Sequence, residues 1–326
     1  MINEEKWIAF GLVPSRRLGQ SLGVNNIPPK VCTYSCIYCQ LGRTNNQIVQ
    51  RKPFYKPKEI KYAVDKKIKE ARNRGEIIDY ITFVPDGEPT LDINIGKEIE
   101  ILKTLDIKVA VITNASLLWK RDVQDDLSNA DCVSLKIDTV NKKNWKKINR
   151  PHQSLNIGKV ISGLSEFSQD FRGELITETM LIRNLNDNTR ELEMIADFIE
   201  GLTPKKSYIS IPTRPPTEKW AAPAAEFDIN IAYQVLKDRG IDAEFLTGYE
   251  GNAFAFTGDV EEDLLSITSV HPMREEGVNN FLSKAKAGWS IIEKLIKEDK
   301  LVEVGYKGNK FYMRKLPGKY HVNFRG

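Results

Sequence analysis

Three of the four cysteines in this 326-residue chain lie within eight residues, in the segment Cys32-Thr-Tyr-Ser-Cys36-Ile-Tyr-Cys39. Thiolates at these spacings can converge on one metal centre from a single loop. A cubane iron–sulfur cluster takes four thiolates, one per iron, so three would leave one iron open to a small molecule. The remaining cysteine, Cys132, opens an apolar segment, which favours a buried core residue over a ligand.

Zinc is the alternative to a cluster. Structural zinc takes four Cys or His ligands, usually as two pairs, and no second pair lies near this loop. The three histidines, at positions 152, 271 and 321, are all distant in sequence. A disulfide framework would instead spread an even number of cysteines along a short secreted chain. The cysteine pattern therefore favours a cluster, and zinc stays open.

The elements that would position this loop alternate along the chain. Short, β-branched apolar segments predict strands at residues 22–25, 79–84, 107–112, 132–137, 174–182 and 208–211. Amphipathic segments between them predict helices, at about residues 60–71, 96–105, 121–127, 157–167 and 191–199. Six strands that alternate with five helices imply an α/β fold with a parallel sheet, either open and doubly wound or curved into part of a barrel.

The rhythm changes in a turn-rich segment near residue 250, which predicts a boundary between domains at 1–250 and 251–326. Three helical patterns and two strand-like segments follow, the order of a winged helix-turn-helix. From Lys284 to the end there are eleven Lys/Arg and four Asp/Glu, and the predicted wing carries Lys307, Lys310, Arg314 and Lys315. Such a module could bind nucleic acid phosphates or a peptide, or serve as a structural appendage.

Composition excludes several classes of protein. Hydrophobic residues make up 41% and charged residues 28%, as in an ordinary globular protein. No apolar segment is long enough to cross a bilayer, and the first residues lack the pattern of a signal peptide. The sequence therefore predicts a cytoplasmic protein that does not bind membranes.

The cysteine spacing, with the aromatic Tyr38 before the last cysteine, is similar to the signature of the radical SAM superfamily. Further matches follow in that family's order. Gly87-Glu88-Pro89 resembles the family's Gly-Gly-Glu-Pro segment, with Asp86 in place of the first glycine, and Thr113-Asn114 resembles Thr-Asn-Gly, with Ala115 as a departure. The resemblance covers about residues 10–250 and implies a partial (β/α)6 TIM-type barrel with its site at the carboxyl ends of the strands.

This resemblance implies two cofactors, a [4Fe–4S] cluster and S-adenosylmethionine (SAM), which would yield a 5′-deoxyadenosyl radical that takes hydrogen from a substrate. It assigns the cluster to Cys32, Cys36 and Cys39. It assigns the residues that contact SAM, namely Tyr38, Gly87, Glu88, Pro89, Asn114, Ser134, Lys136, Asp138 and Asn186. Because side chains alternate along a strand, Ser134, Lys136 and Asp138 would lie on one face of the fourth strand. The alternative interpretation is that this face is exposed to solvent and binds no ligand.

Two arginines are candidates for the substrate site. Arg17 follows a Pro-Ser turn, and Arg214 lies in a proline-stiffened loop after the sixth strand. Arg17 could clamp an anionic group or be ordinary surface charge. For Arg214 a substrate role is favoured, and a plain turn is the alternative.

The opening segment, residues 10–30, resembles the radical SAM core of wyosine-synthesis-like iron–sulfur oxidoreductases, although no cysteine precedes Cys32. The resemblance implies a one-electron donor of flavodoxin or ferredoxin type. The leading hypothesis is a radical SAM enzyme that acts on a macromolecule, RNA or a peptide or protein, recruited by the C-terminal module. A non-catalytic iron–sulfur or redox-sensing regulator that binds DNA through the winged helix is the competing hypothesis.

Overall fold

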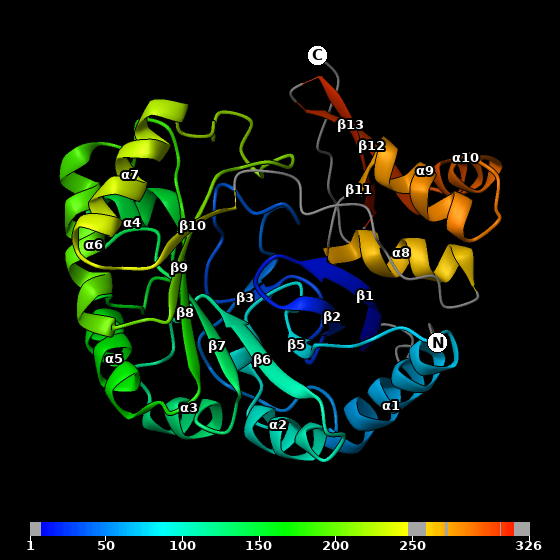
Figure 1. Cartoon of the computed structure of the whole chain (residues 1–326), viewed down its shortest axis with the longest axis horizontal. Coiled ribbons are helices and arrows are strands. Elements are labelled where there is room, and N and C mark those ends of the chain that lie inside the picture. Colours follow the sequence, from blue (N-terminus) through cyan, green and yellow to red (C-terminus); the bar gives the residue numbers. More distant parts are fainter. Residues whose placement is uncertain (1–7, 247–258, 271–272, 307, 316–326) are drawn as a thin grey trace.

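The computed structural model describes residues 8–246, 259–270, 273–306 and 308–315. Its main feature is a sheet with the strand order β1-β2-β5-β6-β7-β8-β9-β10. The strands are β1 (Ala9–Ser15), β2 (Gly19–Val24), β5 (Tyr80–Phe83), β6 (Lys108–Thr113), β7 (Cys132–Lys136), β8 (Glu174–Met180), β9 (Lys206–Ser210) and β10 (Ala243–Leu246). β1 pairs antiparallel with β2, and every later neighbouring pair is parallel. Because β1 and β10 are both edges, the curved sheet forms a half-barrel that does not close (Figure 1).

Helices cover the convex face of this sheet (Figure 1). They are α1 (Pro57–Asn73), α2 (Ile95–Lys103), α3 (Arg121–Leu127), α5 (Ile157–Asp170), α6 (Thr189–Leu202) and α7 (Glu226–Asp238). A shorter helix, α4 (Lys142–Ile148), lies in the connection between β7 and α5. Within the described residues, no helix combines the length and the apolar character that a bilayer span requires.

The predicted α/β half-barrel is confirmed, and the six predicted strands coincide with β2 and β5 to β9. The edge strands β1 and β10 and the helices α4 and α7 were not predicted. β1 contains Gly11 and Pro14, which are rare in strand interiors and weaken the pattern. α7 is rich in Ile, Phe and Tyr, which are weak helix formers.

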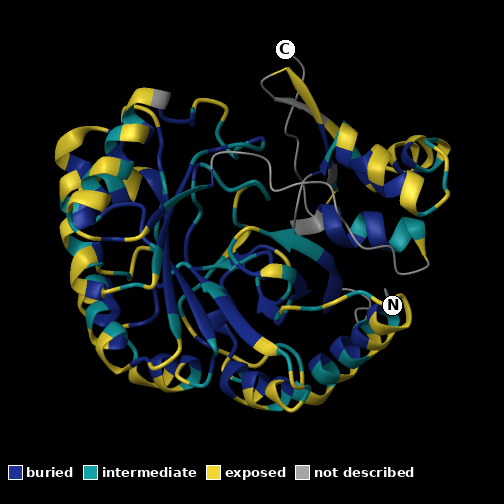
Figure 2. Ribbon diagram, in the orientation of Figure 1, coloured by how far each residue is buried: buried dark blue, intermediate teal, exposed yellow. Residues whose placement is uncertain are grey.

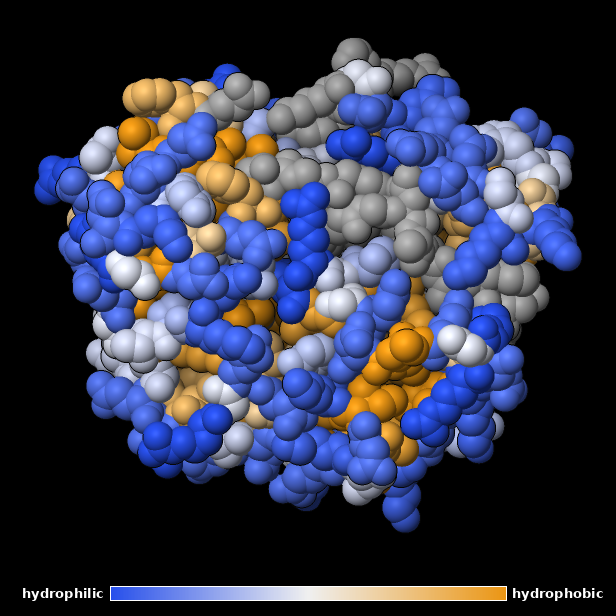
Figure 3. All heavy atoms as spheres, viewed as in Figure 1, coloured by the Kyte–Doolittle hydropathy of each residue, from blue (hydrophilic) through white to orange (hydrophobic). Residues whose placement is uncertain are grey.

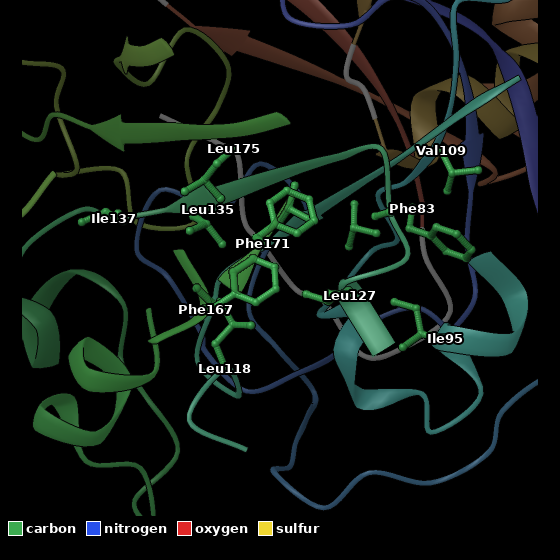
Figure 4. Close-up of a cluster of buried hydrophobic side chains, with 14 of the residues drawn as sticks. Phe83, Ile95, Val109, Leu118, Leu127, Leu135, Ile137, Phe167, Phe171 and Leu175 are labelled. Atoms are coloured by element: carbon green, nitrogen blue, oxygen red, sulfur yellow. The ribbon is translucent and has the colours of Figure 1, made fainter. Parts of the chain in front are cut away.

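The core follows from the two-residue period of the strands. Leu135 of β7 and Leu175 of β8 lie in one buried cluster with Phe167 of α5, so that apolar side chains fill the layer between sheet and helices (Figure 4). Buried residues line the sheet side of each helix and exposed residues its solvent side (Figure 2). The helices therefore sit on a sheet whose concave face is free to carry polar groups.

The concave face is apolar at one end only. A small cluster there joins Leu18, Ala110, Cys132, Ile176 and Tyr208. Cys132 is fully buried in this layer, as the sequence predicted, and burial raises the pKa of its thiol to about 12. This layer closes the half-barrel at the amino ends of the strands and leaves the carboxyl ends for the site.

The C-terminal part has its own core and a three-stranded sheet of order β11-β13-β12. Its elements are α8 (Val260–Val270), β11 (Met273–Arg274), α9 (Glu275–Lys284), α10 (Ser290–Lys297), β12 (Leu301–Tyr306) and β13 (Asn309–Arg314). The predicted helices and hairpin are present, β11 was not predicted, and the winged helix-turn-helix assignment stays a prediction. The expected boundary at 250 and 251 and Lys307 lie outside the described residues.

This part packs against the half-barrel through β1 and α1. Val13 of β1 joins the C-terminal core. A β-carbon added at Gly11 would lie 3.2 Å from the side chain of Ile267 of α8, so this side chain packs directly on the backbone of β1. Ion pairs between Lys67 and Asp263 and between Lys284 and Glu76 add polar contacts, at 3.7 and 3.1 Å.

Candidate functional site

The loop that carries the three cysteines is tied at its start to the segment after β5. Cys32 ends the short strand β3 (Val31–Cys32), which pairs with β4 (Asn46–Gln47). Val31 also pairs with Gly87, and its carbonyl accepts a hydrogen bond from the Glu88 amide at 3.1 Å. The first cysteine and the Gly-Glu-Pro segment are therefore held as one unit.

Gly87 is required by this close approach. A β-carbon at Gly87 would lie 1.9 Å from the Val31 carbonyl oxygen, so Gly87→Ala must displace one of the two backbones. We expect it to destabilise the fold by about 1–3 kcal/mol and to lower the iron bound after reconstitution. Thermal unfolding and iron analysis measure the two effects. Gly201→Ala is the matched control, because no atom lies within 4 Å of its added carbon, and equal behaviour of the two variants would disprove the crowding.

N–H groups from the end of β6, from the end of α4 and from the loop itself reach two of the cysteine sulfurs. The Asn114 amide and the Tyr34 backbone N–H each lie 3.5 Å from Cys32 Sγ, and the Asn149 amide lies 3.6 Å from Cys36 Sγ. Burial raises the pKa of all three cysteine thiols, that of Cys36 to about 12. Thiols in this state lose their protons when they bind metal, and the N–H groups then stabilise the thiolates.

The donor set suits a cluster better than a single ion. Among the described residues, no three Cys, His, Asp or Glu side chains are placed to hold one metal ion. Three half-buried cysteines on one loop, with N–H donors aimed at two sulfurs, suit separate corners of a cubane, one thiolate per iron. The residues therefore fit a [4Fe–4S] cluster with one iron left without a protein ligand.

Glu88 lies beside Cys32, fully buried, with both carboxylate oxygens hydrogen-bonded. Oε1 accepts from the hydroxyl groups of Thr90 and Thr113, and Oε2 accepts from the backbone N–H of Asn114 at 2.8 Å. Burial raises the pKa of Glu88, and these hydrogen bonds oppose the rise. Oε2 has one donor and can accept another. Asn114 in turn contacts Cys32, so carboxylate and sulfur are connected through one residue.

A second group of side chains lies beside Cys36. Tyr38 donates its hydroxyl hydrogen bond to Asp138. Asp138 also accepts from the Asn149 amide at 2.7 Å and from the Met180 backbone N–H at 3.0 Å. Lys136 places its ammonium 5.1 Å from the centre of the Tyr38 ring. The aromatic residue of the cysteine motif is thus fixed by the end of β7.

The side chain of Asn186 connects the ends of two strands. It is fully buried, and its amide donates to the carbonyls of Asp138 and Met180 at 2.7 and 2.8 Å. Its oxygen accepts from the Ile182 backbone N–H at 2.8 Å. Asn186 therefore joins the ends of β7 and β8, and a direct cofactor contact stays a prediction.

An ion-pair network that the sequence did not predict crosses the concave face. Glu178 of β8 accepts from Lys136 at 2.6 Å, from Arg17, and from Ser210 at 2.9 Å. Burial alone would raise the pKa of Glu178, but Lys136 and Arg17 outweigh it and hold the pKa at about 2. The sequence signal for this network is a charged residue inside an apolar strand. In the sheet, Glu178 lies directly opposite Lys136. Ser134 lies two residues before Lys136 and is also buried.

The segment after β9 covers the outer side of the cysteine loop. Arg214 donates to Gln40 at 2.9 Å, Thr217 donates to the Cys39 carbonyl at 2.7 Å, and the Glu218 amide donates to the Ile37 carbonyl at 2.9 Å. Arg214 and Arg17 are therefore on different sides of the site. Their contact with substrate stays a prediction.

Asp86, which replaces the first glycine of the Gly-Gly-Glu-Pro segment, has a buried cationic partner. Asp86 is buried and pairs with the buried Lys30, with 3.5 Å between carboxylate and ammonium. Burial raises the pKa of Asp86 to about 6, although Lys30 opposes the rise. The acidic residue that replaces glycine is thus matched by a cation two residues before Cys32.

A half-barrel that gathers three cysteines and an amino-acid-sized set of polar groups at its strand ends defines a cluster-binding α/β-barrel protein. The sequence pattern of the Radical SAM superfamily matches residues 26–199, and the chain belongs to this superfamily. Members use a [4Fe–4S] cluster and SAM, and these are the cofactors of this chain.

Named relatives agree with this placement. The UPF0026 protein MJ1312 of Methanocaldococcus jannaschii is 46% identical over 316 residues, 96% of this chain and 97% of that protein. Streptococcus suis SuiB, solved with its precursor peptide SuiA, has a similar fold (TM-score 0.53, 12% identity, 77% of this chain and 52% of that one). So does TYW1 solved with a lysine-pyruvate adduct (TM-score 0.52, 14% identity, 67% of this chain and 73% of that one). At these identities the two structures establish the fold alone.

Proposed function

We propose that this protein is a radical SAM oxidoreductase or transferase that removes a hydrogen atom from its substrate, with one cluster on Cys32, Cys36 and Cys39. The observation that carries the proposal is the continuity of the site. Hydrogen bonds connect Cys32 to Glu88 through Asn114, and Cys36 to Asp138 through Asn149. A redox sensor would not need a buried carboxylate beside its cluster, so this continuity favours catalysis over the regulator hypothesis.

When bound, the cluster supplies one electron that splits SAM into methionine and the 5′-deoxyadenosyl radical. The protein's part is to hold both ends of SAM. Glu88 Oε2 accepts from the α-ammonium, since a buried carboxylate gains a charge-assisted hydrogen bond there. Lys136 and Ser134 meet the carboxylate, and Gly87, Pro89 and Asn114 shape the turn around the methionine.

Residues near Cys36 hold the other end of SAM, its adenine and ribose. Tyr38 lies against the adenine, and Asp138 holds the Tyr38 hydroxyl and reaches the ribose. Asn186 supports both by fixing the strand ends. Arg17 inside the half-barrel and Arg214 on the cysteine loop are the residues we assign to an anionic group of the substrate.

The substrate we propose is a macromolecule, RNA or a peptide or protein, recruited by the C-terminal part acting as a winged helix. The order of its helices and its hairpin supports that assignment. Its basic surplus is partly neutralised, because Lys310 pairs with Glu303 at 3.3 Å and Lys315 pairs with Asp299. Peptide recognition needs less free positive charge than nucleic acid binding. The similar fold of SuiB, which was solved with a peptide, agrees with it.

Anaerobic reconstitution with iron and sulfide, followed by dithionite and SAM, tests the proposal by the release of 5′-deoxyadenosine. Glu88→Gln removes the charge that faces the α-ammonium and sets an amide N–H against the Asn114 N–H. We expect it to weaken SAM binding about tenfold to hundredfold, measured by equilibrium titration.

Glu98→Gln is the matched control for this variant. Burial and the nearby Asp92 raise the pKa of Glu98 to about 9, so this side chain is already neutral at pH 7.5. We expect its SAM affinity to equal that of the wild type. Unchanged binding by Glu88→Gln would remove Glu88 from the site, and a reconstituted wild type that does not bind SAM would refute the proposed function.

A further inference from the structure

Positive charge is concentrated in two segments that meet at the cluster. Between Asp138 and Glu166 the sequence has five lysines and one arginine and no acidic residue. Between Glu5 and Glu59, the segment that contains the cysteine loop, it has nine Lys/Arg and again no acidic residue. The C-terminal part also has a surplus of positive charge, so the net charge of the whole chain does not reveal these two segments.

Helix α4 belongs to the first segment and packs directly on the cysteine loop. Its Trp145 donates to the Tyr34 hydroxyl at 3.0 Å, with the two rings edge to face at 5.9 Å. The Ile148 carbonyl accepts from the Ile37 amide at 2.9 Å, and Asn149, the next residue, reaches Cys36. The helix is therefore separated from the cluster ligands by a single layer of side chains.

The opposite side of this helix carries its charge. We call Lys142, Lys143, Lys146 and Lys147 the α4 lysines; all four are exposed, whereas Trp145 and Ile148 are buried. Within the described part of the chain, none of the four has an acidic partner, in contrast to Lys294, Lys310 and Lys315 in the C-terminal part.

Local stability accounts for only part of this charge. Lys146 and Lys147 lie in the last turn of α4, where the helix dipole favours cations, but Lys142 and Lys143 lie in its first turn, where the dipole disfavours them. Like charges one turn apart, such as Lys143 and Lys147, also repel each other. A partner of opposite sign therefore explains the charge at the start of the helix better than helix stability does.

Further cations continue the surface around the cysteine loop. Arg43, 65% exposed, and Arg150 both bind one oxygen of Glu218, so two cations surround one carboxylate. Lys219 and Trp220 next to it are exposed, Trp220 by 56%. A second exposed aromatic residue, Phe227, lies in the first turn of α7. Figure 3 shows a hydrophobic area at its upper left, where α7 lies in Figure 1.

We propose that the α4 lysines, with Arg43 and Lys219, form the docking surface for an acidic one-electron carrier protein. The carrier loses one electron and the cluster gains it. This inference rests on the proposed function, because it supplies the electron that SAM cleavage consumes. Electron-transfer encounters use small interfaces that are steered by complementary charge, and a basic surface one layer from the cluster meets both conditions.

RNA is the competing occupant, since exposed cations and an aromatic residue also suit nucleic acid. The position decides between them. The α4 lysines lie outside the loop that binds the cluster, whereas Arg17, assigned to the substrate, and Lys136, assigned to SAM, both pair with Glu178 on the concave face of the sheet. A substrate must reach the concave face, but an electron carrier only needs to approach the cluster.

The test compares reduction by a protein with reduction by a small molecule. The variant is Lys143→Glu/Lys147→Glu, and the control is Lys66→Glu/Lys69→Glu on α1, which reverses the same number of exposed charges. Stopped-flow absorbance follows cluster reduction by reduced flavodoxin at low and high salt, and by dithionite. Equilibrium titration measures flavodoxin affinity for the same proteins, and circular dichroism verifies their folding.

We expect the α4 variant to lower the second-order rate with flavodoxin about tenfold or more at low salt, with a matching loss of affinity. High salt should reduce the difference. Dithionite reduction and the α1 control should not change. An unchanged flavodoxin rate and affinity would overturn the inference, as would lost RNA binding with normal flavodoxin binding. Failure of dithionite to release 5′-deoxyadenosine from wild type would instead count against the proposed function.

Discussion

Replacement of Cys36 by alanine is expected to abolish cluster binding and 5′-deoxyadenosine release together. The remaining Cys32 and Cys39 cannot bind three irons, and Cys132, the other cysteine, is buried in a separate apolar layer. Reconstituted Cys36→Ala should be colourless near 400 nm, hold little iron and sulfide, and yield no nucleoside with dithionite and SAM.

The matched control is Cys132→Ala, which removes the cysteine that lies outside the loop. Cys132 is buried in an apolar layer, so its loss should cost about 1–2 kcal/mol of stability without changing the iron content. If Cys36→Ala kept a normal cluster, or if Cys132→Ala lost it, the assignment of the ligands would be wrong.

Glu178→Gln is expected to cause the largest loss of stability. Glu178 is the shared counterion of Lys136 and Arg17, whose side chains are 17% and 14% exposed. Its removal leaves these two largely buried cations without this carboxylate. Breaking a buried pair in this way costs about 3–5 kcal/mol. Urea unfolding of the apoprotein at pH 7 measures the change in the free energy of unfolding.

The pH dependence separates this effect from a general loss of packing. The pKa of Glu178 is held at about 2 in the folded protein, below its unfolded value of about 4.3. Its contribution is complete above the unfolded pKa and is lost as the pH falls toward 2, so wild type and variant should converge in acid. Glu174→Gln on the same strand removes only the exposed pair with Lys205 and should cost under about 1 kcal/mol. A difference that stayed constant from pH 6 to 3 would contradict the charge argument.

The sequence predicted the repeating part of the fold because each βα unit has a strong local pattern. β5 to β9 are short β-branched segments, and the helices between them are amphipathic. The edges escaped prediction because they depend on tertiary contacts. β1 is a strand with a glycine and a proline that lies between β2 and α8, and β10 is short and pairs only with β9.

The site was predictable where its residues are contiguous. The cysteines, Tyr38 and Gly87-Glu88-Pro89 are recognisable as short motifs. Glu178 was missed because its partners come from three other segments, and only the sheet register places it opposite Lys136. The pairing of Asp86 with Lys30 was missed for the same reason, since 56 positions separate the two residues.

The packing of α8 on β1 has a consequence for how the chain holds together. An antiparallel edge strand with unpaired backbone groups invites pairing with other chains, and proteins commonly cover such edges. Here the cover is the C-terminal part, whose apolar core includes Val13 of that strand. The two parts therefore share a structural element, and we expect removal of the C-terminal part to expose β1 and to lower the solubility of the half-barrel. Cutting the chain between the two parts would expose this edge strand to pairing with other chains and would not yield an independent enzyme core.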